Sequence, residues 1–340
     1  MVVRPDARPT LEAVAAHAGV SRATVSRVIN DSPKVSPEAK AAVLSAIEKL
    51  GYIPNPAART LVTRRTDAIA LVVSESEERV FAEPFFADIV RGISTALADT
   101  ELQLLLIMAQ SPAQRRRLQH YLSGQRVDGV LLLSLHGSDP LPRMLEQMGV
   151  PSVLGGTPTG VEPASYVEVD NLRGAQQAVE YLLGLGRRRI ATIAGPQDMN
   201  AGVRRLLGYR QAISTAGLRV DENLIAQGDF SEESGARAMR KLLARSPDLD
   251  AVFAASDPMA IGAMRVLKEH GRAIPGDVGL IGFDDSPSAR HTDPPLTTVH
   301  QPVEAMGREM ARLLLARIRG DERADPVVIL DAHLVRRGSA

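Results

Sequence analysis

Two residue types are missing from this sequence of 340 residues, which contains no cysteine and no tryptophan, and aromatic residues amount to only 3%. Without cysteine there can be no disulfide framework, no thiol nucleophile and no cysteine-ligated metal site. No apolar run approaches the roughly 18 residues of a membrane span, and the first residues lack the apolar core of a signal peptide. We therefore expect a cytoplasmic protein that has no membrane partner.

Catalytic signatures are also scarce. The sequence has no G-x-x-x-x-G-K-[ST] phosphate loop, no G-x-S-x-G nucleophile elbow and no H-E-x-x-H metal helix. Asp284 and Asp285 could form an acid pair, but adjacent side chains at the end of a strand usually point apart. The seven histidines include no closely spaced ligand pair. We expect a protein that is not an enzyme and that needs no metal ion or cofactor.

The charge of the chain is zero overall but unevenly distributed. Residues 1–65 hold ten Lys and Arg against five Asp and Glu, a net charge of +5, and the remainder of the chain carries −5. A solvated charged face would not predict that the sign changes at one boundary. A basic amino-terminal module on an acidic body is typical of a small DNA-binding domain.

The stretch from Thr10 to Asn30, TLEAVAAHAGVSRATVSRVIN, predicts two short helices joined by a tight turn at Gly19. Ser21 is a natural N-cap for the second helix. The exposed face of that helix then offers side chains that contact phosphates and base edges, on a helix that fits a DNA major groove. A plain helical hairpin is the alternative. We favour a helix-turn-helix domain over residues 1–53.

A third amphipathic helix is predicted from Ser36–Pro37 to Gly51, and it would complete a minimal core. The following segment, residues 54–65, predicts a short hinge helix over 56–62 that is too short to be stable alone. Leu61 is the large apolar residue in it, and it either packs against the body or inserts as a wedge into a minor groove.

From Asp67 onward, short apolar runs alternate with amphipathic helices, which favours parallel sheets covered by helices. The first expected set of strands is 68–73, 102–108, 127–133 and 152–154, with helices near 85–99, 113–124 and 139–149. The second set is 166–169, 189–194, 224–226, 251–254 and 278–282, with helices near 171–185, 201–216, 232–245 and 257–271. Strand 296–300, helix 303–319 and one or two strands within 326–335 follow.

The expected fold is therefore an amino-terminal all-α helix-turn-helix domain followed by an α/β core of two doubly wound parallel-sheet subdomains over residues 66–340. We assign residues 66–160 and 292–323 to the first subdomain, and 161–291 and 324–340 to the second. Doubly wound sheets bind ligands at the carboxyl ends of their strands, so two facing subdomains place both sets of ends around one cleft.

The residues at these strand ends suit a polyhydroxylated ligand, because carboxylates, arginine and amides bind hydroxyls while aromatic rings stack on the apolar face of a sugar. One histidine, His136, lies where a contact with the ligand is plausible. The candidate effector-binding residues are Glu75, Phe85, Phe86, His136, Asp170, Arg205, Phe230, Ser256, Asp257 and Asp284.

An ordered set of motifs resembles the LacI/GalR family of bacterial transcription regulators. It includes the helix pair and GYIPNPAARTL, and it continues through VDGVLLL, LGRRRIATIAGP, ASDPMAIGAM, IGFDD and PPLTTVHQP over nearly the whole chain. The resemblance implies a homodimer or tetramer that reads a pseudo-palindromic operator in double-stranded DNA. It also implies a core like that of the periplasmic binding proteins, which binds a small effector.

The same resemblance assigns roles to single residues. Arg22 and Ala23 fall where members select bases, Arg27 is the commonly shared groove contact, and Leu61 is the hinge leucine. Arg205 matches the effector-binding arginine, Phe230 the stacking aromatic and Asp284 the acidic ligand residue, whereas Ser256 replaces a commoner Asn or Asp. The full set of candidate DNA-binding residues is Thr10, Ser21, Arg22, Ala23, Thr24, Ser26, Arg27, Asn30, Asn55, Ala58 and Leu61.

Two further stretches, ALVVSESEERVFAEPFFADIVRGI and SYVEVDN, resemble actinobacterial regulators of cellobiose and other glucoside uptake. The implied function is a repressor of sugar utilisation genes that leaves its operator when cellobiose, a cello-oligosaccharide or another glucoside binds. Maltose regulators share the ARTLVTRRT hinge, so a maltose-responsive regulator is an alternative, as is a corepressor-type member. A sugar-binding transport protein could share the core, but the basic residues 1–65 and the missing signal peptide argue against it.

Overall fold

A computed structural model describes residues 9–29, 32, 34–53, 65–157, 165–321 and 325–340. The chain divides into two compact units, Met1–Thr66 and Asp67–Ala340, and each is described by itself. None of the helices among the described residues combines the length and apolar character that a membrane crossing requires.

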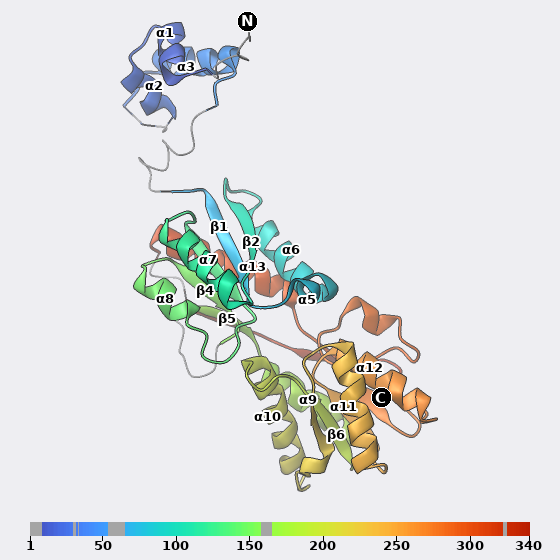
Figure 1. Cartoon of the computed structure of the whole chain (residues 1–340). Helices are drawn as coiled ribbons and strands as arrows, with labels where there is room; N and C mark the ends of the chain where they lie inside the picture. Colours follow the sequence, from blue (N-terminus) through green and yellow to red (C-terminus); the bar gives the residue numbers. More distant parts are fainter. Residues whose placement is uncertain (1–8, 30–31, 33, 54–64, 158–164, 322–324) are drawn as a thin grey trace, which may run out of the picture. The chain divides into compact units, whose positions relative to one another are not determined.

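The first unit is a three-helix domain of α1 (Leu11–Ala18), α2 (Arg22–Ile29) and α3 (Pro37–Leu50), drawn in blue in Figure 1. Thr10 caps α1 by accepting a hydrogen bond from the Ala13 amide at 3.3 Å, and the Ser21 hydroxyl accepts one from the Thr24 amide at 3.1 Å. Gly19 has a φ of 66°, a left-handed conformation that glycine adopts at little cost, so the turn between the helices forms there as predicted.

The core of this unit is small and is built from inward-facing residues of all three helices and from Tyr52. Its buried members are Val14, Ala15, Val25, Val28, Val43, Ala46 and Tyr52. The apolar spacing of residues 37–50 predicts Leu44 on the inner face of α3, but Leu44 is 51% exposed and Ala46 is buried instead. The predicted hinge helix over 56–62 lies outside the described residues.

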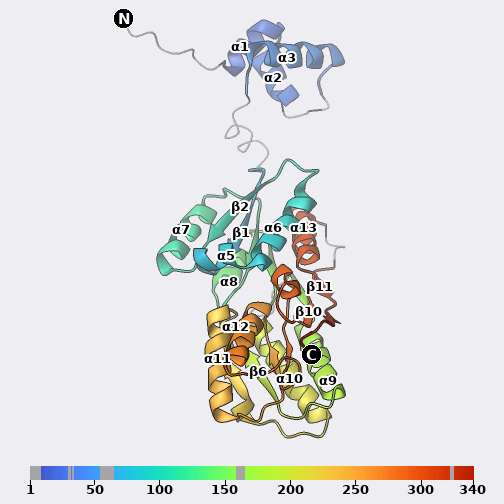
Figure 2. The same ribbon diagram turned by 90° about the vertical axis from the view of Figure 1, so that its right-hand side faces the viewer.

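The second unit contains two parallel sheets, each with helices on both faces (Figures 1 and 2). The six-stranded sheet of the first lobe has the order β11-β5-β4-β3-β1-β2, and the four-stranded sheet of the second lobe has the order β7-β6-β8-β9. We call these the N-lobe and the C-lobe. A two-stranded antiparallel pair, β10 and β12, lies beside β9 through a bridge between Ile281 and Thr297.

The elements of the N-lobe are β1 (Ala68–Val73), α5 (Glu77–Ala82), α6 (Pro84–Leu97), β2 (Gln103–Met108), α7 (Pro112–Ser123), β3 (Gly129–Leu133), α8 (Leu141–Gln147), β4 (Ser152–Gly155), β5 (Tyr166–Val169), α13 (Val303–Arg319) and β11 (Val327–Leu330). Those of the C-lobe are α9 (Asn171–Gly184), β6 (Ile190–Ala194), α10 (Asn200–Thr215), β7 (Ile225–Gln227), α11 (Glu232–Arg245), β8 (Ala251–Ala254), α12 (Asp257–Glu269), β9 (Gly279–Ile281), β10 (Thr298–His300), β12 (His333–Val335) and the 3-10 turns Glu222–Leu224 and Pro287–Arg290.

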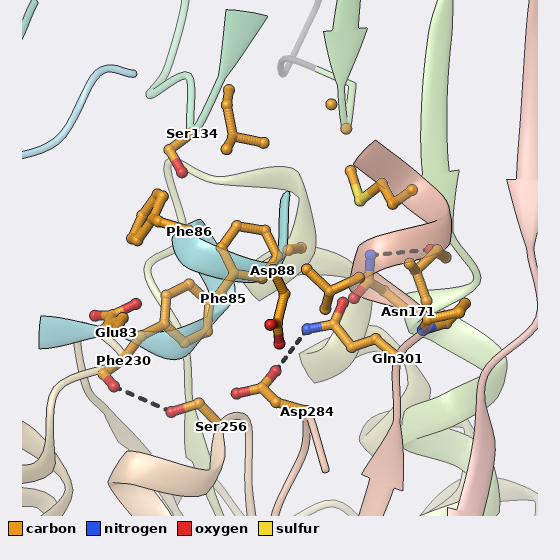
Figure 3. Close-up of a pocket in the computed structure, with 18 of the residues that line it drawn as sticks. Glu83, Phe85, Phe86, Asp88, Ser134, Asn171, Phe230, Ser256, Asp284 and Gln301 are labelled. Atoms are coloured by element: carbon orange, nitrogen blue, oxygen red, sulfur yellow. Dashed lines mark hydrogen bonds between the residues drawn. The ribbon is translucent and has the colours of Figure 1, made fainter. Parts of the chain in front are cut away.

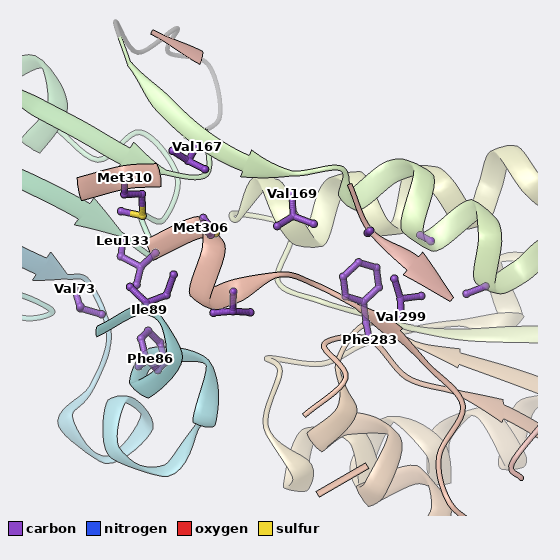
Figure 4. Close-up of a cluster of buried hydrophobic side chains, with 14 of the residues drawn as sticks. Val73, Phe86, Ile89, Leu133, Val167, Val169, Phe283, Val299, Met306 and Met310 are labelled. Atoms are coloured by element: carbon purple, nitrogen blue, oxygen red, sulfur yellow. The ribbon is translucent and has the colours of Figure 1, made fainter. Parts of the chain in front are cut away.

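Alternation along the strands divides each lobe into two cores. In β1, Ile69, Leu71 and Val73 face α6 and α13, whereas Ala70 and Val72 join the core under α7 and α8. Because both faces of a parallel sheet are covered, nearly every residue of β1 and β3 is buried, and the sequence reads as continuous apolar runs. Figure 4 shows the first of these cores, which continues into the C-lobe around Phe283 and Val299.

The expected grouping is wrong for three strands. Thr298–His300 (β10), expected in the first subdomain with residues 292–323, pairs with β12 beside β9 of the C-lobe. Tyr166–Val169 pairs in parallel with β4 and with β11, so β5 and β11 belong to the six-stranded sheet of the N-lobe rather than to the second subdomain. The chain therefore enters the C-lobe after residue 169 instead of near 161, and Asp170 caps the helix α9 that follows the crossing. The order of elements along the chain carries no sign of this, because a four-residue strand can pair with either sheet.

Candidate functional site

The exposed residues of α2 form the candidate DNA-contacting surface. Arg22, Ala23 and Arg27 are exposed, while Thr24 and Ser26 are half-buried beside the inward-facing Val25 and Val28. Arg22 forms an ion pair with Glu12 of α1 at 3.2 Å, and both side chains are largely exposed. Such a pair contributes little to stability, so Arg22 can exchange Glu12 for a phosphate or a base. Asn30, Asn55, Ala58 and Leu61 lie outside the described residues.

A cavity of about 460 Å³ lies between the two lobes of the second unit (Figure 3). Its walls come from the carboxyl ends of strands in both sheets and from the amino-terminal turns of α6, α9, α10 and α13. Among the predicted effector-binding residues, the cavity is lined by Phe85, Phe86, Arg205, Phe230, Ser256 and Asp284.

Arg205 and Asp284 form the buried polar centre of the cavity. The guanidinium donates from Nε to Asn171 Oδ1 at 2.8 Å and from an NH group to the Ala255 carbonyl at 2.6 Å, and it lies 3.5 Å from Asp284 Oδ1. The guanidinium carbon, Cζ, also lies 3.7 Å from the ring centre of Phe283. Burial lowers the pKa of Arg205 to about 10, which leaves it protonated near neutral pH.

The backbone of Asp284 has a positive φ of 125°, which is unusual for a residue other than glycine. Its Oδ1 accepts a hydrogen bond from Gln301 Nε2 at 2.6 Å, which Figure 3 marks with a dashed line. Burial raises the pKa of Asp284 to about 6, while the nearby Arg205 opposes this rise. The polar centre of the cavity therefore combines the carboxyl group of Asp284, the guanidinium of Arg205 and the amide side chains of Asn171 and Gln301.

An aromatic ring from each lobe completes the cavity. Phe85 of α6 is half-buried and meets Phe86 edge to face, with ring centres 5.3 Å apart, while Phe86 belongs to the core. Phe230 of the C-lobe also has a positive φ of 73°, and Figure 3 shows its ring near that of Phe85. Ser256 lines the wall, but its hydroxyl donates to the Phe230 carbonyl at 3.1 Å and accepts from the Met259 amide as the cap of α12. It holds Phe230 in place and has little capacity left for a ligand.

Four predicted effector residues do not line the cavity, which corrects their assignment. Glu75 is buried beside His136, with its Oε1 3.2 Å from the imidazole Nε2. Asp170 caps α9 by accepting from the Arg173 amide at 3.0 Å. Asp257 is fully buried and accepts from the Ser286 amide at 2.7 Å and the Thr298 hydroxyl at 2.5 Å. Burial raises the pKa of Asp257 to about 8.

Several residues that line the cavity were not among the candidates. They include Arg79, Glu83, Ser134, Asn171, Glu168 and Gln301. Burial raises the pKa of Glu83 to about 7, and burial also raises the pKa of Glu168. Asn171 and Ser134 lie close to the carboxyl ends of strands, so their positions in the sequence could have identified them as cavity residues. Arg79 and Glu83 come from α5 and the residue that follows it, a helix that the sequence pattern did not predict. Among the described residues, no cluster of His, Asp and Glu is arranged to hold a metal ion.

Comparisons with known proteins find a matching family for each of the two units. Residues 10–55 match the family described as bacterial regulatory proteins, lacI family, and residues 179–340 match a periplasmic binding protein-like domain. The HTH-type transcriptional regulator CelR of Thermobifida fusca is 58% identical over 335 residues, 98% of each chain. The HTH-type transcriptional repressor CytR of Escherichia coli K12 is 36% identical over 97% of this chain and 96% of that protein.

Solved structures give the same result over the full length. A complex of the transcriptional regulator CelR with cellobiose is 55% identical, has a TM-score of 0.79, and covers 98% of this chain and 100% of that one. A lac repressor dimer bound to operator and the anti-inducer ONPF is 26% identical, has a TM-score of 0.84, and covers 98% of this chain and 99% of that one. With a helix-turn-helix unit, a two-lobed core and these full-length relatives, the chain belongs to the LacI family of bacterial transcriptional regulators.

Proposed function

We propose that this protein is a cytoplasmic, homodimeric repressor of sugar utilisation genes that leaves its operator when cellobiose or a short cello-oligosaccharide binds between the lobes. It has no catalytic activity in this proposal. Residues 1–53 read the operator, residues 54–65 form the hinge, and the second unit binds the effector and the partner subunit. The similarity to CelR, which has been solved with cellobiose, supports the choice of sugar.

The observation that carries the proposal is the composition of the cavity. Its walls hold the carboxyl groups of Glu83, Asp88, Glu168, Asp284, Asp285 and Glu304 against the guanidinium groups of Arg79, Arg91, Arg205 and Arg308. Because acidic groups outnumber basic ones, the cavity favours a neutral ligand with many hydroxyls over a phosphorylated sugar or a nucleotide. The rings of Phe85 and Phe230 supply the apolar faces on which a pyranose ring stacks.

The proposed mechanism is a shift between two arrangements of the lobes. A sugar that contacts both lobes binds one arrangement more tightly than the other, and this difference in affinity is what can move the equilibrium. If that arrangement holds the two hinge segments of a dimer out of register with the operator, sugar binding releases the DNA. A corepressor would bind in the same cavity but favour the arrangement of the lobes that holds the operator, so it would strengthen DNA binding.

The test is an operator mobility shift with the full-length protein and DNA selected from a random library. The complex is titrated with cellobiose, longer cello-oligosaccharides, maltose and a purine. We expect release by the β-linked glucosides, with little effect of maltose or the purine. Release by maltose alone would move the assignment to α-glucosides, and tighter DNA binding with cellobiose would make the protein a corepressor-type member. Release by none of these ligands would contradict the sugar assignment and leave the DNA-binding function standing.

A further inference from the structure

The short helix α5 occupies a position that none of the roles above explains. It begins after Ser76, whose hydroxyl accepts a hydrogen bond from the Arg79 amide at 3.2 Å. Arg79 and Glu83 are one helical turn apart, and both line the cavity. The helix therefore places a guanidinium and a carboxyl group of the N-lobe in the wall of the effector cavity.

The guanidinium of Arg79 is held in one orientation by two carboxyl groups. Its Nε donates to Glu83 Oε1 at 2.7 Å, and an NH group donates to Glu75 Oε1 at 3.0 Å. Among the described residues these bonds use two of the five N–H donors of an arginine, which leaves three that a ligand's hydroxyl groups can use. A donor whose orientation is already fixed loses less conformational entropy when a ligand binds.

Arg79 also reaches across to the C-lobe. Its guanidinium carbon lies 5.6 Å from the ring centre of Phe230, and the guanidinium carbon of Arg205 lies at the same distance of 5.6 Å. The ring of Phe230 is thus contacted by one guanidinium from each lobe. Because such contacts need close approach, the contact with Arg79 is lost when the lobes separate.

We propose that Arg79 determines effector specificity and couples the effector to the lobes, binding sugar hydroxyls from the N-lobe while its cation–π contact with Phe230 holds the C-lobe. This inference rests on the sugar-responsive function proposed above. Glu75 offsets the charge of Arg79, and Glu83, whose pKa burial raises to about 7, offsets it further as the pH rises, so this group attracts neutral hydroxyls rather than phosphates. A phosphorylated disaccharide placed here would meet the same carboxyl groups and be repelled.

The binding test uses Arg79→Gln in the full-length protein, with Arg312→Gln as the matched control. Arg312 lies outside the cavity lining, pairs with Glu309 on its own helix α13 at 2.7 Å and has a side chain that is 51% exposed. By titration calorimetry we expect Arg79→Gln to weaken cellobiose binding about tenfold or more, as for loss of a charged hydrogen bond in a buried site. We expect Arg312→Gln to change the affinity by less than about twofold, since exposed ion pairs contribute little. Operator binding without sugar should be unchanged in Arg312→Gln.

The coupling test uses the absence of cysteine in the natural sequence. Arg117→Cys on α7 and Lys241→Cys on α11 place one spin label on each lobe, at exposed positions outside the cavity. We expect saturating cellobiose to change the distance between the labels, and we expect Arg79→Gln to reduce that change even when the site is full. A purely structural role of Arg79 would lower stability without altering the distance at saturation.

The outcomes separate this inference from the function on which it rests. If the unsubstituted protein binds cellobiose and Arg79→Gln binds it equally well with the same change in distance, Arg79 has neither role and the proposed function stands. If the unsubstituted protein binds no glucoside, the proposed effector is wrong and the role of Arg79 falls with it. Binding of cellobiose 6-phosphate more tightly than cellobiose would contradict the charge argument.

Discussion

Replacing His136 with glutamine should weaken effector binding below neutral pH and remove part of its pH dependence. The imidazole lies between two carboxyl groups from different lobes, with Nε2 3.2 Å from Glu75 of the N-lobe and Nδ1 2.9 Å from Asp198 of the C-lobe. The Gly137 amide adds a hydrogen bond to the Asp198 carbonyl at 2.7 Å. Both ring nitrogens can donate at once only when the imidazole is protonated.

The sign of the effect follows from the pKa of His136. The hydrogen bond with Glu75 is the largest cause that raises this pKa above its ordinary value of 6.5; burial opposes it, and the bond with Asp198 adds to it. Opening the cleft removes Asp198, so the closed arrangement binds the proton more tightly than the open one. The protonated His136 therefore stabilises the closed arrangement fully at a pH below its ordinary pKa. This stabilisation is lost as the pH rises through the raised pKa of the closed arrangement. Cellobiose should therefore bind more tightly at about pH 6 than at about pH 8.

The expected magnitude is modest. A charge-assisted hydrogen bond contributes about 1.5–3 kcal/mol, but Asp198 is 56% exposed, so we discount the bridge between lobes to about 1 kcal/mol. This corresponds to roughly a fivefold change in the dissociation constant across the transition. Arg79 also pairs with Glu75, at 3.0 Å, but this ion pair lies within the N-lobe and is not counted in the bridge between the lobes.

The assay is titration calorimetry of cellobiose against the full-length protein between about pH 6 and pH 8. His120→Gln, at an exposed position of α7 in the same lobe, is the control. Asp284 and Glu83 also titrate near this range, so the relevant quantity is the difference between the unsubstituted protein and His136→Gln. An identical pH slope in the two proteins, or the same loss of slope in the control, would refute the reasoning.

Three further predictions concern other parts of the chain. Arg205→Ala should retain operator binding while cellobiose releases the DNA at least about tenfold less effectively in a mobility shift, because the buried donor to the ligand is gone; normal release would contradict the pocket assignment. Leu61→Ala should weaken specific operator binding roughly tenfold and non-specific binding much less, since a wedge acts at one base step; equal losses would exclude the wedge. Gly262→Ala should lower stability by about 1–3 kcal/mol in thermal unfolding, because the added methyl overlaps the Glu232 carbonyl where α11 and α12 touch. Gly184→Ala, which meets no atom within 4 Å, should be nearly neutral, and equal destabilisation of both would contradict the packing argument.

The regular elements of the core were predictable because their local signals agree. The bounds of β1, β8, α11 and α13 match the expected ranges, since buried parallel strands read as unbroken apolar runs and long helices have clear periodicity. The helix-turn-helix pair formed as expected around its glycine turn. The strand β5 was misplaced, because its partner β11 lies far along the chain and no local property of the residues YVEV identifies it.

The cavity was predictable in location but only partly in its residues. The strand ends lead to segments that line the cavity, but the exact position of each residue in the turn after the strand decides whether its side chain enters the cavity. Asn171 lines it while the adjacent Asp170 caps the helix, and Ser256 lines it while Asp257 is buried behind. Helix α5 was missed because it has only six residues, too few for a periodic pattern, and depends on its cap and on the ion pairs of Arg79.

The paired strands β5 and β11 have a consequence for any attempt to divide the second unit. The chain passes between the lobes after β5, again between β10 and α13, and a third time between β11 and β12. Each lobe is therefore built from separate stretches of sequence, and no single cut releases a complete one. Removing the residues from 326 onward, for example, would take an edge strand from the N-lobe and, with β12, the only partner of β10 in its two-stranded sheet among the described residues. To obtain either lobe as a separate protein, its separate segments would have to be joined by new linkers or co-expressed as fragments.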